Sequence, residues 1–270
     1  FLAMSSVEIY CITDKVIPHV ESLDYNIVGV SKSDFPENYL KCNTGDNIFY
    51  KEKYYSELTF HYWYWKNKIN INNNNWVGFC QKRRFWLRPE SKNKTITKEN
   101  LKDNLIQKPL DIWSSYETIL CEPINLFPVK KMKMLKRGLR SLILDPMIFF
   151  DEKKQTIKFH FDMHHGYSNL DKAIDLLNDN DREEFRSYVN TKNFYNPHIM
   201  FISKSKIINE WFSVLFPWLE NCEKIFSFKE LDKKYDTQRI FAFLAERYLS
   251  FWFKKYTNFY ENPWVFLDNK

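Results

Sequence analysis

The sequence predicts an α/β fold in which a mixed central sheet is flanked by helices. Short apolar runs typical of buried strands alternate along the 270 residues with stretches in which apolar residues recur at helical spacing. Aromatic residues make up 18% of the chain and there are only 5 glycines, a composition that favours a packed core over disorder. Neither an internal repeat nor a linker interrupts this pattern, so we expect a single domain.

The expected strands are short apolar stretches that end in polar or turn-forming residues. They cover residues 7–12, 25–30, 76–80, 117–121, 141–150, 156–161 and 198–202. The expected helices cover residues 54–67, 97–105, 181–189, 204–220 and 237–256, and a further one begins at Ser168 with Asp171 in a capping box. In the first helix, Tyr54, Leu58, Tyr62 and Trp65 share one face at helical spacing, and we expect that face to meet the core.

The strand at 76–80 carries the strongest functional signal. It is followed by Lys82, Arg83 and Arg84, and then at once by Phe85 and Trp86. Cations at the end of a buried strand are costly unless an anion meets them. In open α/β sheets, the ligand crevice lies beyond the carboxyl ends of the strands. Two interpretations carry equal weight, a clamp for a phosphate or diphosphate and a solvated cluster of charges.

The charge and the cysteines exclude several classes of protein. A net charge of +6 suits an anionic small molecule or an acidic membrane surface, and no nucleic-acid-binding signature accompanies it. The 5 cysteines are scattered without a Cys-x-x-Cys pair, which argues against a disulfide framework or a zinc site and indicates a reducing compartment. No apolar run is long enough to span a bilayer, and no signal peptide precedes Val7. We expect a cytoplasmic protein, at most peripheral to the inner face of the cell membrane.

Several short motifs, in this order and spacing, resemble a known family. They are Asn43-Thr-Gly-Asp-Asn-Ile48, Tyr55-Ser-Glu-Leu-Thr59, Tyr62-Trp-Tyr-Trp-Lys-Asn67, Trp76-Val-Gly-Phe-Cys80 with Arg83-Arg84-Phe85, Asn196-Pro-His198 with Met200-Phe-Ile202, and Phe243-Leu-Ala-Glu-Arg247. Together they resemble a bacterial family of capsular and exopolysaccharide glycosyltransferases, formerly described as a domain of unknown function. Gln81-Lys82 stands where the family often has His-Tyr, and Ile199 where it often has Asn. These differences concern the sugar and the acceptor rather than the fold.

The resemblance implies a GT-A-like (Rossmann-like) sandwich that binds a nucleotide sugar. A donor-binding half would cover about 4–125, an acceptor-side half about 126–256, and an aromatic tail 257–270. The implied activity is sugar transfer, with inversion, from a UDP-linked donor to a growing capsular or surface polysaccharide. The acceptor would be an oligo- or polysaccharide, free or lipid-linked. The alternative is a non-catalytic nucleotide- or glycan-binding module of a polysaccharide assembly complex.

The donor diphosphate would be held by Lys82, Arg83 and Arg84. Many GT-A enzymes instead place an Asp-x-Asp after a central strand to hold a divalent ion. The sequence Asp179-Asn-Asp181 has that form, but its place between two helices is better explained by helix capping. Because cations can neutralise a leaving diphosphate, we expect a metal-independent enzyme without a cofactor, with a divalent metal as the less favoured alternative.

Four further residues are candidate donor contacts. Thr13 ends the first strand, Asp46 and Asn47 lie in the loop before the first long helix, and Glu57 lies in the first turn expected for that helix. Each has a purely structural alternative: a strand end for Thr13, an Asx-rich turn for Asp46 and Asn47, and a favourable helix-dipole position for Glu57.

The acceptor side carries the candidate base. Glu246 lies in a mostly apolar helix, where partial desolvation would suit proton abstraction from a sugar hydroxyl. The alternative is a structural ion pair with Arg239 or a more distant cation. Asp162 and His165 are the reserve candidates for the base, and His164 and His198 are candidate acceptor contacts. Each histidine has the alternative of a hydrogen-bonded structural role.

Two further patterns concern metal and membrane binding. His160 and His164 have the spacing of a metal pair on a helix, but the alternation around them predicts a strand, and we expect no zinc site. Near the C-terminus, Phe251-Trp-Phe-Lys-Lys-Tyr256 mixes aromatic residues with cations. Such a composition suits a weak membrane contact, and equally a helix packed on the core with lysines at its end.

Overall fold

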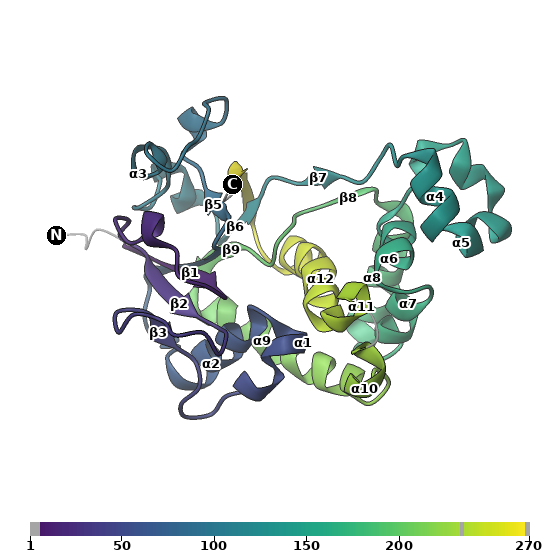
Figure 1. Ribbon diagram of the computed structural model, residues 1–270. Coiled ribbons are helices and arrows are strands. Elements are labelled where there is room, and N and C mark those ends of the chain that lie inside the picture. Colours follow the sequence, from purple (N-terminus) through teal and green to yellow (C-terminus); the bar gives the residue numbers. More distant parts are fainter. Residues whose placement is uncertain (1–5, 233–234, 268–270) are drawn as a thin grey trace. The chain divides into compact units, whose positions relative to one another are not determined.

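The computed structural model describes residues 6–232 and 235–267 (Figure 1). The chain divides into two compact units. The first unit comprises Phe1–Glu122, His198–Val214 and Trp252–Lys270, and the second comprises Pro123–Pro197 and Leu215–Phe251. We describe each unit separately.

A mixed sheet forms the centre of the first unit. Its strands are β1 (Val7–Thr13), β2 (Asn26–Gly29), β3 (Leu40–Lys41), β4 (Trp76–Gln81), β5 (Arg84–Trp86), β6 (Thr118–Cys121), β9 (Phe201–Lys204), β10 (Phe259–Asn262) and β11 (Trp264–Phe266). The order along the main path is β10-β6-β9-β4-β1-β2-β3, and β5 and β11 form a short antiparallel extension of β4. The α/β class with a mixed central sheet is therefore confirmed.

The strand directions bring several loops to one edge of this sheet. Strand β1 runs parallel to β2 and β4, with Cys11 opposite Cys80, so the carboxyl ends of these strands share an edge. Strand β9 runs antiparallel between β4 and β6, so it begins at the edge where β4 ends. The residues just after β1 and β4, and those just before β9, therefore meet at this edge.

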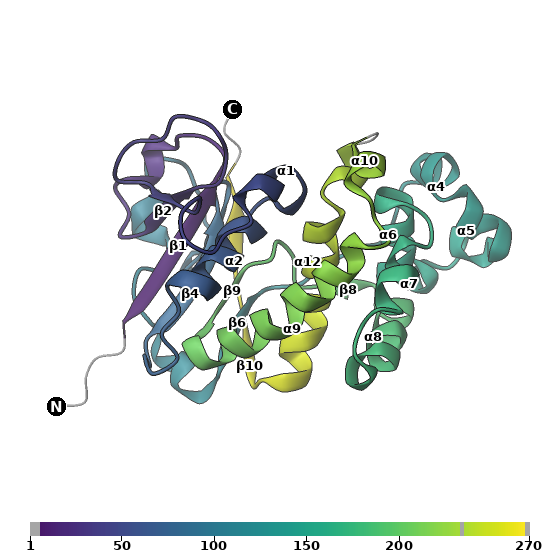
Figure 2. The same ribbon diagram turned by 90° about the horizontal axis from the view of Figure 1, so that it is seen from below.

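Helices cover one face of the sheet (Figure 2). They are α1 (Glu52–Tyr55), α2 (Leu58–Asn67) and the first part of α9 (Ser205–Glu223). The ring of His61 in α2 packs against Phe79 of β4, Phe201 of β9 and Phe212 of α9. Alternate side chains of the buried strands point to this face, as a period of two requires.

The predicted first helix needs two corrections. It is broken at Ser56, whose φ of 51° ends α1 before α2 begins. Its buried face is formed by Leu58, Thr59, Phe60, His61 and Tyr64, whereas Tyr62 and Trp65 are only half-buried. Of the predicted stripe only Leu58 is buried: the break at Ser56 separates Tyr54 from α2, and within α2 the buried face includes Phe60, His61 and Tyr64 instead of Tyr62 and Trp65.

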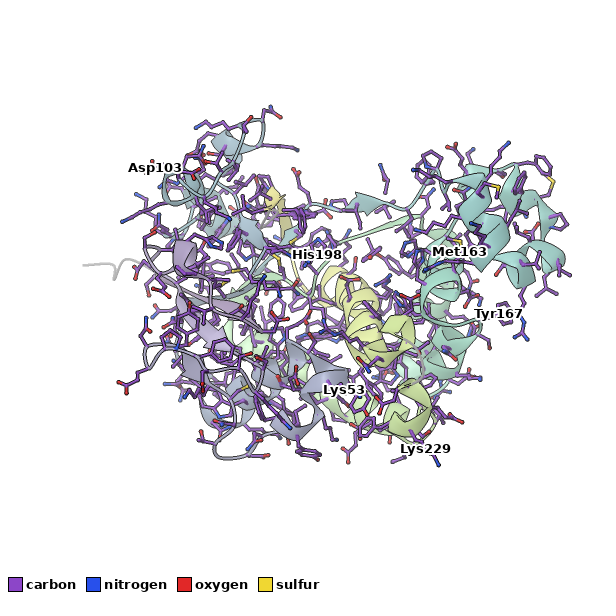
Figure 3. The ribbon with its side chains drawn as sticks, in the orientation of Figure 1. Lys53, Asp103, Met163, Tyr167, His198 and Lys229 are labelled. Carbon is purple, nitrogen blue, oxygen red and sulfur yellow. The ribbon has the colours of Figure 1, made fainter. Side chains whose placement is uncertain are left out.

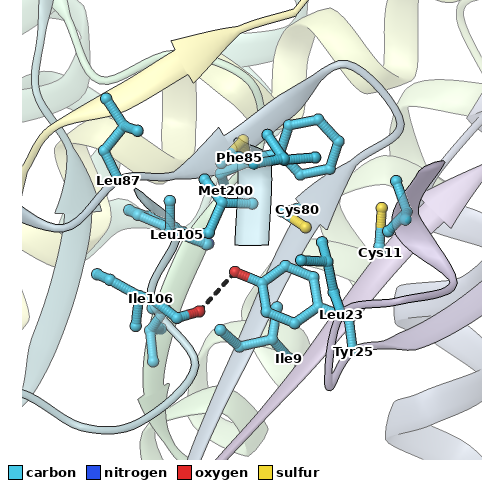
Figure 4. Close-up of a cluster of buried hydrophobic side chains, with 14 of the residues drawn as sticks. Ile9, Cys11, Leu23, Tyr25, Cys80, Phe85, Leu87, Leu105, Ile106 and Met200 are labelled. Carbon is cyan, nitrogen blue, oxygen red and sulfur yellow. Dashed lines mark hydrogen bonds between the residues drawn. The ribbon is translucent and has the colours of Figure 1, made fainter. Parts of the chain in front are cut away.

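The opposite face of the sheet carries a second apolar cluster (Figure 4). Short elements cover it: the 3-10 helices η1 (Pro18–Val20), η3 (Pro89–Ser91) and η4 (Asp111–Ser115), and α3 (Leu101–Asn104), while η2 (Phe49–Lys51) leads into α1. Cys11 and Cys80 are buried free thiols within this cluster. The hydroxyl of Tyr25 donates a 2.6 Å hydrogen bond to the carbonyl of Ile106, which ties a loop to the cluster.

Among its described residues, the second unit is helical apart from the short pair β7 (Ile124–Asn125) and β8 (Phe194–Tyr195). Its elements are α4 (Lys131–Arg137), α5 (Leu139–Leu144), η5 (Pro146–Phe149), η6 (Glu152–Lys154), α6 (Ile157–His165), α7 (Asn169–Ile174), α8 (Asp179–Thr191), the second part of α9, α10 (Phe228–Leu231), α11 (Tyr235–Gln238) and most of α12 (Ile240–Tyr256).

The strands predicted at 141–150 and 156–161 are wrong, since both segments are helical. The alternation Ile157, Phe159, Phe161 and Met163 looks like a strand, yet all four side chains are buried on α6. This is possible because α4, α7, α8 and α11 all contact α6, so that it is buried on several sides. Thr156 begins the helix, its side chain accepting a hydrogen bond from the Phe159 amide.

The other helix starts are partly as predicted. Ser168 precedes α7, but with φ of 66° and without a side-chain cap, so the predicted capping box is wrong. Asp179-Asn-Asp181 does begin a helix, α8, whose cap is the side chain of Asn178. Asp179 and Asp181 therefore lie in the first turn of a helix, where its dipole favours acids, and neither of them is the capping residue.

Three of the aromatic residues near the C-terminus lie in the core. Phe251, Trp252 and Phe253 are buried within α12. These three side chains are therefore unavailable to a membrane, which corrects that interpretation of the segment and supports core packing. Among the described helices, none combines the length and hydropathy required to cross a bilayer.

Candidate functional site

The sheet edge at which β1 and β4 end gathers the predicted cations. Lys82 follows β4 directly, and its backbone amide donates a 3.0 Å hydrogen bond to the carbonyl of Ile12 in β1. Its ammonium group forms an ion pair with the carboxylate of Asp14, the residue after β1. The charge of Lys82 is therefore already met by an acid, whereas the two arginines that follow have different surroundings.

Arg83 and Arg84 lie at the turn from β4 into β5 and are half-buried. Their guanidinium carbons lie 5.2 Å and 5.4 Å from the ring centre of Phe266 in β11. Arg84 also donates a 3.1 Å hydrogen bond to the side-chain oxygen of Gln81. Within the described residues, the buried Nε of Arg83 has no hydrogen-bond partner. A buried donor without a partner is costly, and an anion bound here would satisfy it.

Gln81 connects three elements at this edge, and the sequence did not single it out as a contact. Its side-chain amide donates to the carboxylate of Glu57 at 2.6 Å and to the carbonyl of His198 at 2.7 Å. The end of β4, the start of α2 and the entry to β9 are thereby held together. Its position beside the cation row, where the resembled family often has a histidine, is the signal that could have identified it.

Glu57 lies immediately before α2 rather than in its first turn. It is the N-cap residue, but its side chain makes no capping hydrogen bond. The carboxylate is half-buried and faces Gln81. Glu57 therefore belongs to the group of side chains around the end of β4.

The entry to β9 has an unusual backbone. His198 and Ile199 have φ values of 78° and 51°, both in the left-handed region. This region is costly for a β-branched residue such as Ile199, which is buried here. His198, labelled in Figure 3, packs its ring edge-on against Trp264 with 4.5 Å between ring centres. Strained backbone of this kind clusters at functional sites.

Thr13, Asp46 and Asn47 make local contacts. The hydroxyl of Thr13 accepts a 3.1 Å hydrogen bond from the amide of Lys15, as expected for the end of a strand. Asn47 accepts from the Phe49 amide at 3.1 Å, as in an Asx turn, and Asp46 accepts from the Tyr62 hydroxyl at 3.2 Å.

The loop of Asp46 and Asn47 is fixed to the far end of α2. The side chain of Asn67, the last residue of this helix, donates to the carbonyl of Asp46 at 2.7 Å. Since α2 rises about 1.5 Å per residue, this end lies roughly 15 Å from Glu57. The structure therefore brings together Lys82, Arg83, Arg84, Glu57 and His198, and leaves Asp46 and Asn47 apart from them.

In the second unit, Arg247 is the centre of a buried polar group. Its side chain is 2% exposed and forms an ion pair with Glu246. Its guanidinium lies 4.5 Å from the ring centre of Tyr195, and one nitrogen lies 3.3 Å from Nδ1 of His160. The hydroxyl of Tyr195 donates to Glu246 at 3.1 Å. Glu246 thus has an ion-pair partner in its neighbour Arg247.

The histidines beside this group are held neutral. Burial lowers the pKa of His160 and of His165 to about 2, and the positive charge of Arg247 acts in the same direction. His165 donates to the carbonyl of Asp236 at 3.0 Å, and its ring stacks on Phe243 at 3.7 Å. His164 donates to the carbonyl of His160 at 2.8 Å. Their contacts are those of structural histidines, and His160 and His164 do lie one turn apart on a helix.

Asp162 lines a pocket of about 480 Å³ in the second unit. Its carboxylate accepts from Lys158 at 2.9 Å and from the Ser168 amide at 3.0 Å. Burial raises the pKa of Asp162, and the charge of Lys158 opposes that rise. Tyr167, labelled in Figure 3, and Asn190 contribute polar groups to the same pocket. The described residues include no group of three or more His, Cys, Asp or Glu side chains that could hold a metal ion.

Comparisons with known proteins agree with this architecture. A family model described as a domain of unknown function (DUF4422) matches residues 8–258. No curated protein matches the chain. A solved structure, the apo form of WbbM, a bifunctional glycosyltransferase, is similar with a TM-score of 0.74 and 20% sequence identity. The similarity covers 98% of this chain and 46% of that one, so the chain spans less than half the length of WbbM. At this identity the similarity establishes a shared fold.

Proposed function

We propose that the chain, which belongs to the family described as a domain of unknown function (DUF4422), is a glycosyltransferase with a GT-A-like fold. It would transfer a sugar, with inversion, from a UDP-linked donor to a growing capsular or surface polysaccharide. The acceptor would be an oligo- or polysaccharide, free or lipid-linked. The fold shared with WbbM, a bifunctional glycosyltransferase, supports the reaction class.

The observation that carries the proposal is the cation group at the end of β4. Lys82, Arg83 and Arg84 lie at the carboxyl edge of the parallel strands, where α/β folds bind their ligands. Sugar transfer leaves a nucleoside diphosphate, and fixed guanidinium groups can stabilise the charge that develops on it. The proposed enzyme therefore needs no metal ion for this step. Glu57 and His198, held to the same strand end through Gln81, are the proposed donor and acceptor contacts of this edge.

The proposed base is Glu246, with Asp162 and His165 in reserve and His164 as a further acceptor contact. The ion pair of Glu246 with Arg247 also fits a structural role, so mutation must decide whether Glu246 is the base or part of a structural ion pair. His165 is the weakest of the three candidates, because a group with a pKa of about 2 accepts a proton poorly near neutral pH. The pKa of Asp162 is raised by burial, as expected of a carboxylate that takes up protons.

The organisation follows from these assignments. Residues of about 4–125 would bind the donor, those of about 126–256 would contribute the acceptor side, and the two halves would act as one domain. We further propose that Thr13, Asp46 and Asn47 act in the structure of the donor half, as their local hydrogen bonds indicate. The enzyme would act in the cytoplasm at the inner face of the cell membrane, where polysaccharide precursors are extended.

The test is UDP binding by calorimetry to the wild type and to Arg83→Ala and Arg84→Ala. A hydrogen bond to a charged group contributes about 1.5–3 kcal/mol, or about 10- to 150-fold in Kd. Because both side chains are half-buried and exposed to solvent screening, we expect the lower end, about tenfold for each. Arg88→Ala is the matched control: Arg88 lies four residues beyond Arg84, about 13 Å further along an extended strand, and donates to the carbonyl of Leu105.

Two results would contradict the proposal. Unchanged UDP affinity in both arginine variants, with folding intact, would remove the cation row from the donor site. UDP binding without hydrolysis or transfer, across a panel of UDP-sugars and oligosaccharides, would favour the non-catalytic module. Slow hydrolysis of one UDP-sugar by the wild type, reduced in Arg84→Ala but not in Arg88→Ala, would support the enzyme.

A further inference from the structure

The segment 130–154 of the second unit exposes an unusual number of large apolar side chains. Of the fourteen such side chains found exposed in the described residues, seven belong to these residues: Met132, Leu135, Leu139, Ile143, Leu144, Met147 and Phe150. The three most exposed of these seven are Ile143, Leu144 and Phe150, at 70%, 72% and 74%. Isolated exposed apolar residues are normal, but a concentration of them marks a surface that binds something.

These side chains are not the inner face of the segment. Met134, Leu142 and Ile148 form that face and are buried against Phe159 and Met163 of α6. Figures 1 and 2 both show α4 and α5 beside α6, with α5 at the outer end of these three helices. The segment therefore exposes further apolar side chains that its own packing does not use.

The same segment concentrates positive charge. It contains eight cations, all exposed, against three acids, which gives a net charge of +5 out of +6 for the whole chain. The cations are Lys130, Lys131, Lys133, Lys136, Arg137, Arg140, Lys153 and Lys154. Some have local partners: Arg137 pairs with Asp236 and Lys154 with Asp145. We call the exposed apolar and cationic side chains of residues 130–154 the basic apolar surface.

We infer that the basic apolar surface docks the protein onto a lipid bilayer that contains anionic lipids. Apolar side chains flanked by lysines are typical of helices that lie in the membrane interface, where the chains enter the acyl boundary and the cations meet the headgroups. Protein–protein interfaces, by contrast, are depleted in lysine. Charge complementarity therefore favours an anionic bilayer over a second protein. This inference does not rest on the proposed sugar transfer.

The test is flotation of the purified protein with vesicles of phosphatidylcholine, with and without phosphatidylglycerol. We expect the wild type to float only with vesicles that contain phosphatidylglycerol, and to be released by high salt. Ile143→Ser/Leu144→Ser/Phe150→Ser should lower partitioning at least about tenfold, because three apolar side chains are lost from the interface. Lys133→Gln/Lys136→Gln should lower it about thirtyfold, from about 1 kcal/mol for each cation near an anionic surface.

Matched controls come from the first unit. Tyr50→Ser/Ile71→Ser/Ile112→Ser removes three exposed apolar side chains, and Lys94→Gln/Lys98→Gln removes two exposed cations. Both should float like the wild type. All substituted side chains are exposed, so each variant is expected to keep the wild-type circular dichroism spectrum and melting temperature.

Three outcomes would overturn the inference. One is no flotation with phosphatidylglycerol vesicles at low salt. Another is an equal loss in the surface variants and their matched controls, which would make the binding non-specific. The third is self-association in sedimentation velocity that the apolar triple variant abolishes, together with no vesicle binding, which would assign the surface to a second copy of this chain. Because UDP binding is measured without vesicles, failure here leaves the proposed enzyme untouched.

Discussion

Replacing His61 by phenylalanine should make the protein markedly less sensitive to acid. His61 is completely buried among Phe79, Phe201 and Phe212, with ring centres 4.5, 6.0 and 5.6 Å away. Among the described residues, neither of its ring nitrogens has a hydrogen-bond partner. Burial lowers its pKa from 6.5 to about 3. The folded protein therefore holds this histidine neutral where the unfolded chain would protonate it.

The sign and size follow from linkage. The unfolded state binds a proton at His61 near pH 6.5 and the folded state only near pH 3. The contribution of His61 to the free energy of unfolding is therefore complete above pH 6.5, and it is lost progressively as the pH falls towards 3. At pH 5 the loss from this residue is about 2 kcal/mol in the free energy of unfolding, at 1.36 kcal/mol for each pH unit below 6.5. Phenylalanine cannot titrate, and any cost of fitting its larger ring is present at both pH values.

The assay is urea unfolding followed by tryptophan fluorescence at pH 8 and pH 5. Wild type should lose about 2 kcal/mol more than His61→Phe between the two values. His19→Phe is the control, since His19 is only half-buried and its pKa is lowered less. His160 and His165 also contribute to the acid sensitivity of both proteins, so the difference between the variants is the informative quantity. An equal loss in wild type and His61→Phe would refute the reasoning.

Three further predictions concern catalysis and packing. If Glu246 is the base, Glu246→Gln should lower turnover about a hundredfold and leave UDP affinity unchanged. Near-normal turnover would remove Glu246 from the mechanism. Normal turnover with a lowered melting temperature would assign Glu246 to the ion pair with Arg247. Transfer activity should survive excess EDTA, and a loss that magnesium or manganese restores would show that an ion is required. Tyr25→Phe should lower the free energy of unfolding by about 1–2 kcal/mol, since it leaves the Ile106 carbonyl without its 2.6 Å bond; unchanged urea midpoints would contradict this.

Much of the sheet could be predicted because its strands have unambiguous patterns. β1, β4, β6 and β9 are apolar runs bounded by polar residues, and each was found within a few residues of its expected place. The helix at 156–161 could not be recognised, because its buried residues alternate like those of a strand. Period alone fails where a helix is enclosed by neighbours, and it is the structure that shows the cap at Thr156.

The candidate site was predictable where it depended on strand direction. The cations after β4 lie at the carboxyl edge of the sheet because β4 runs parallel to β1. Gln81 was missed as the connecting residue, since only the structure shows it bonded to both Glu57 and His198. Similarly, the ion pair of Glu246 with its own neighbour Arg247 depends on side-chain rotamers, which spacing does not reveal.

The position of β9 has a consequence for how the chain reaches its fold. Strand β9 lies between β4 and β6, yet 119 residues of chain separate Gln81 from Phe201. Pairing so remote in sequence raises the contact order, and such topologies fold slowly because a long loop must close before the contact stabilises it. Until residues 201–204 emerge during synthesis, β4 and β6 would both present unpaired edges. The window between the synthesis of β6 and that of β9 is therefore when this chain is most exposed to aggregation and most dependent on chaperones.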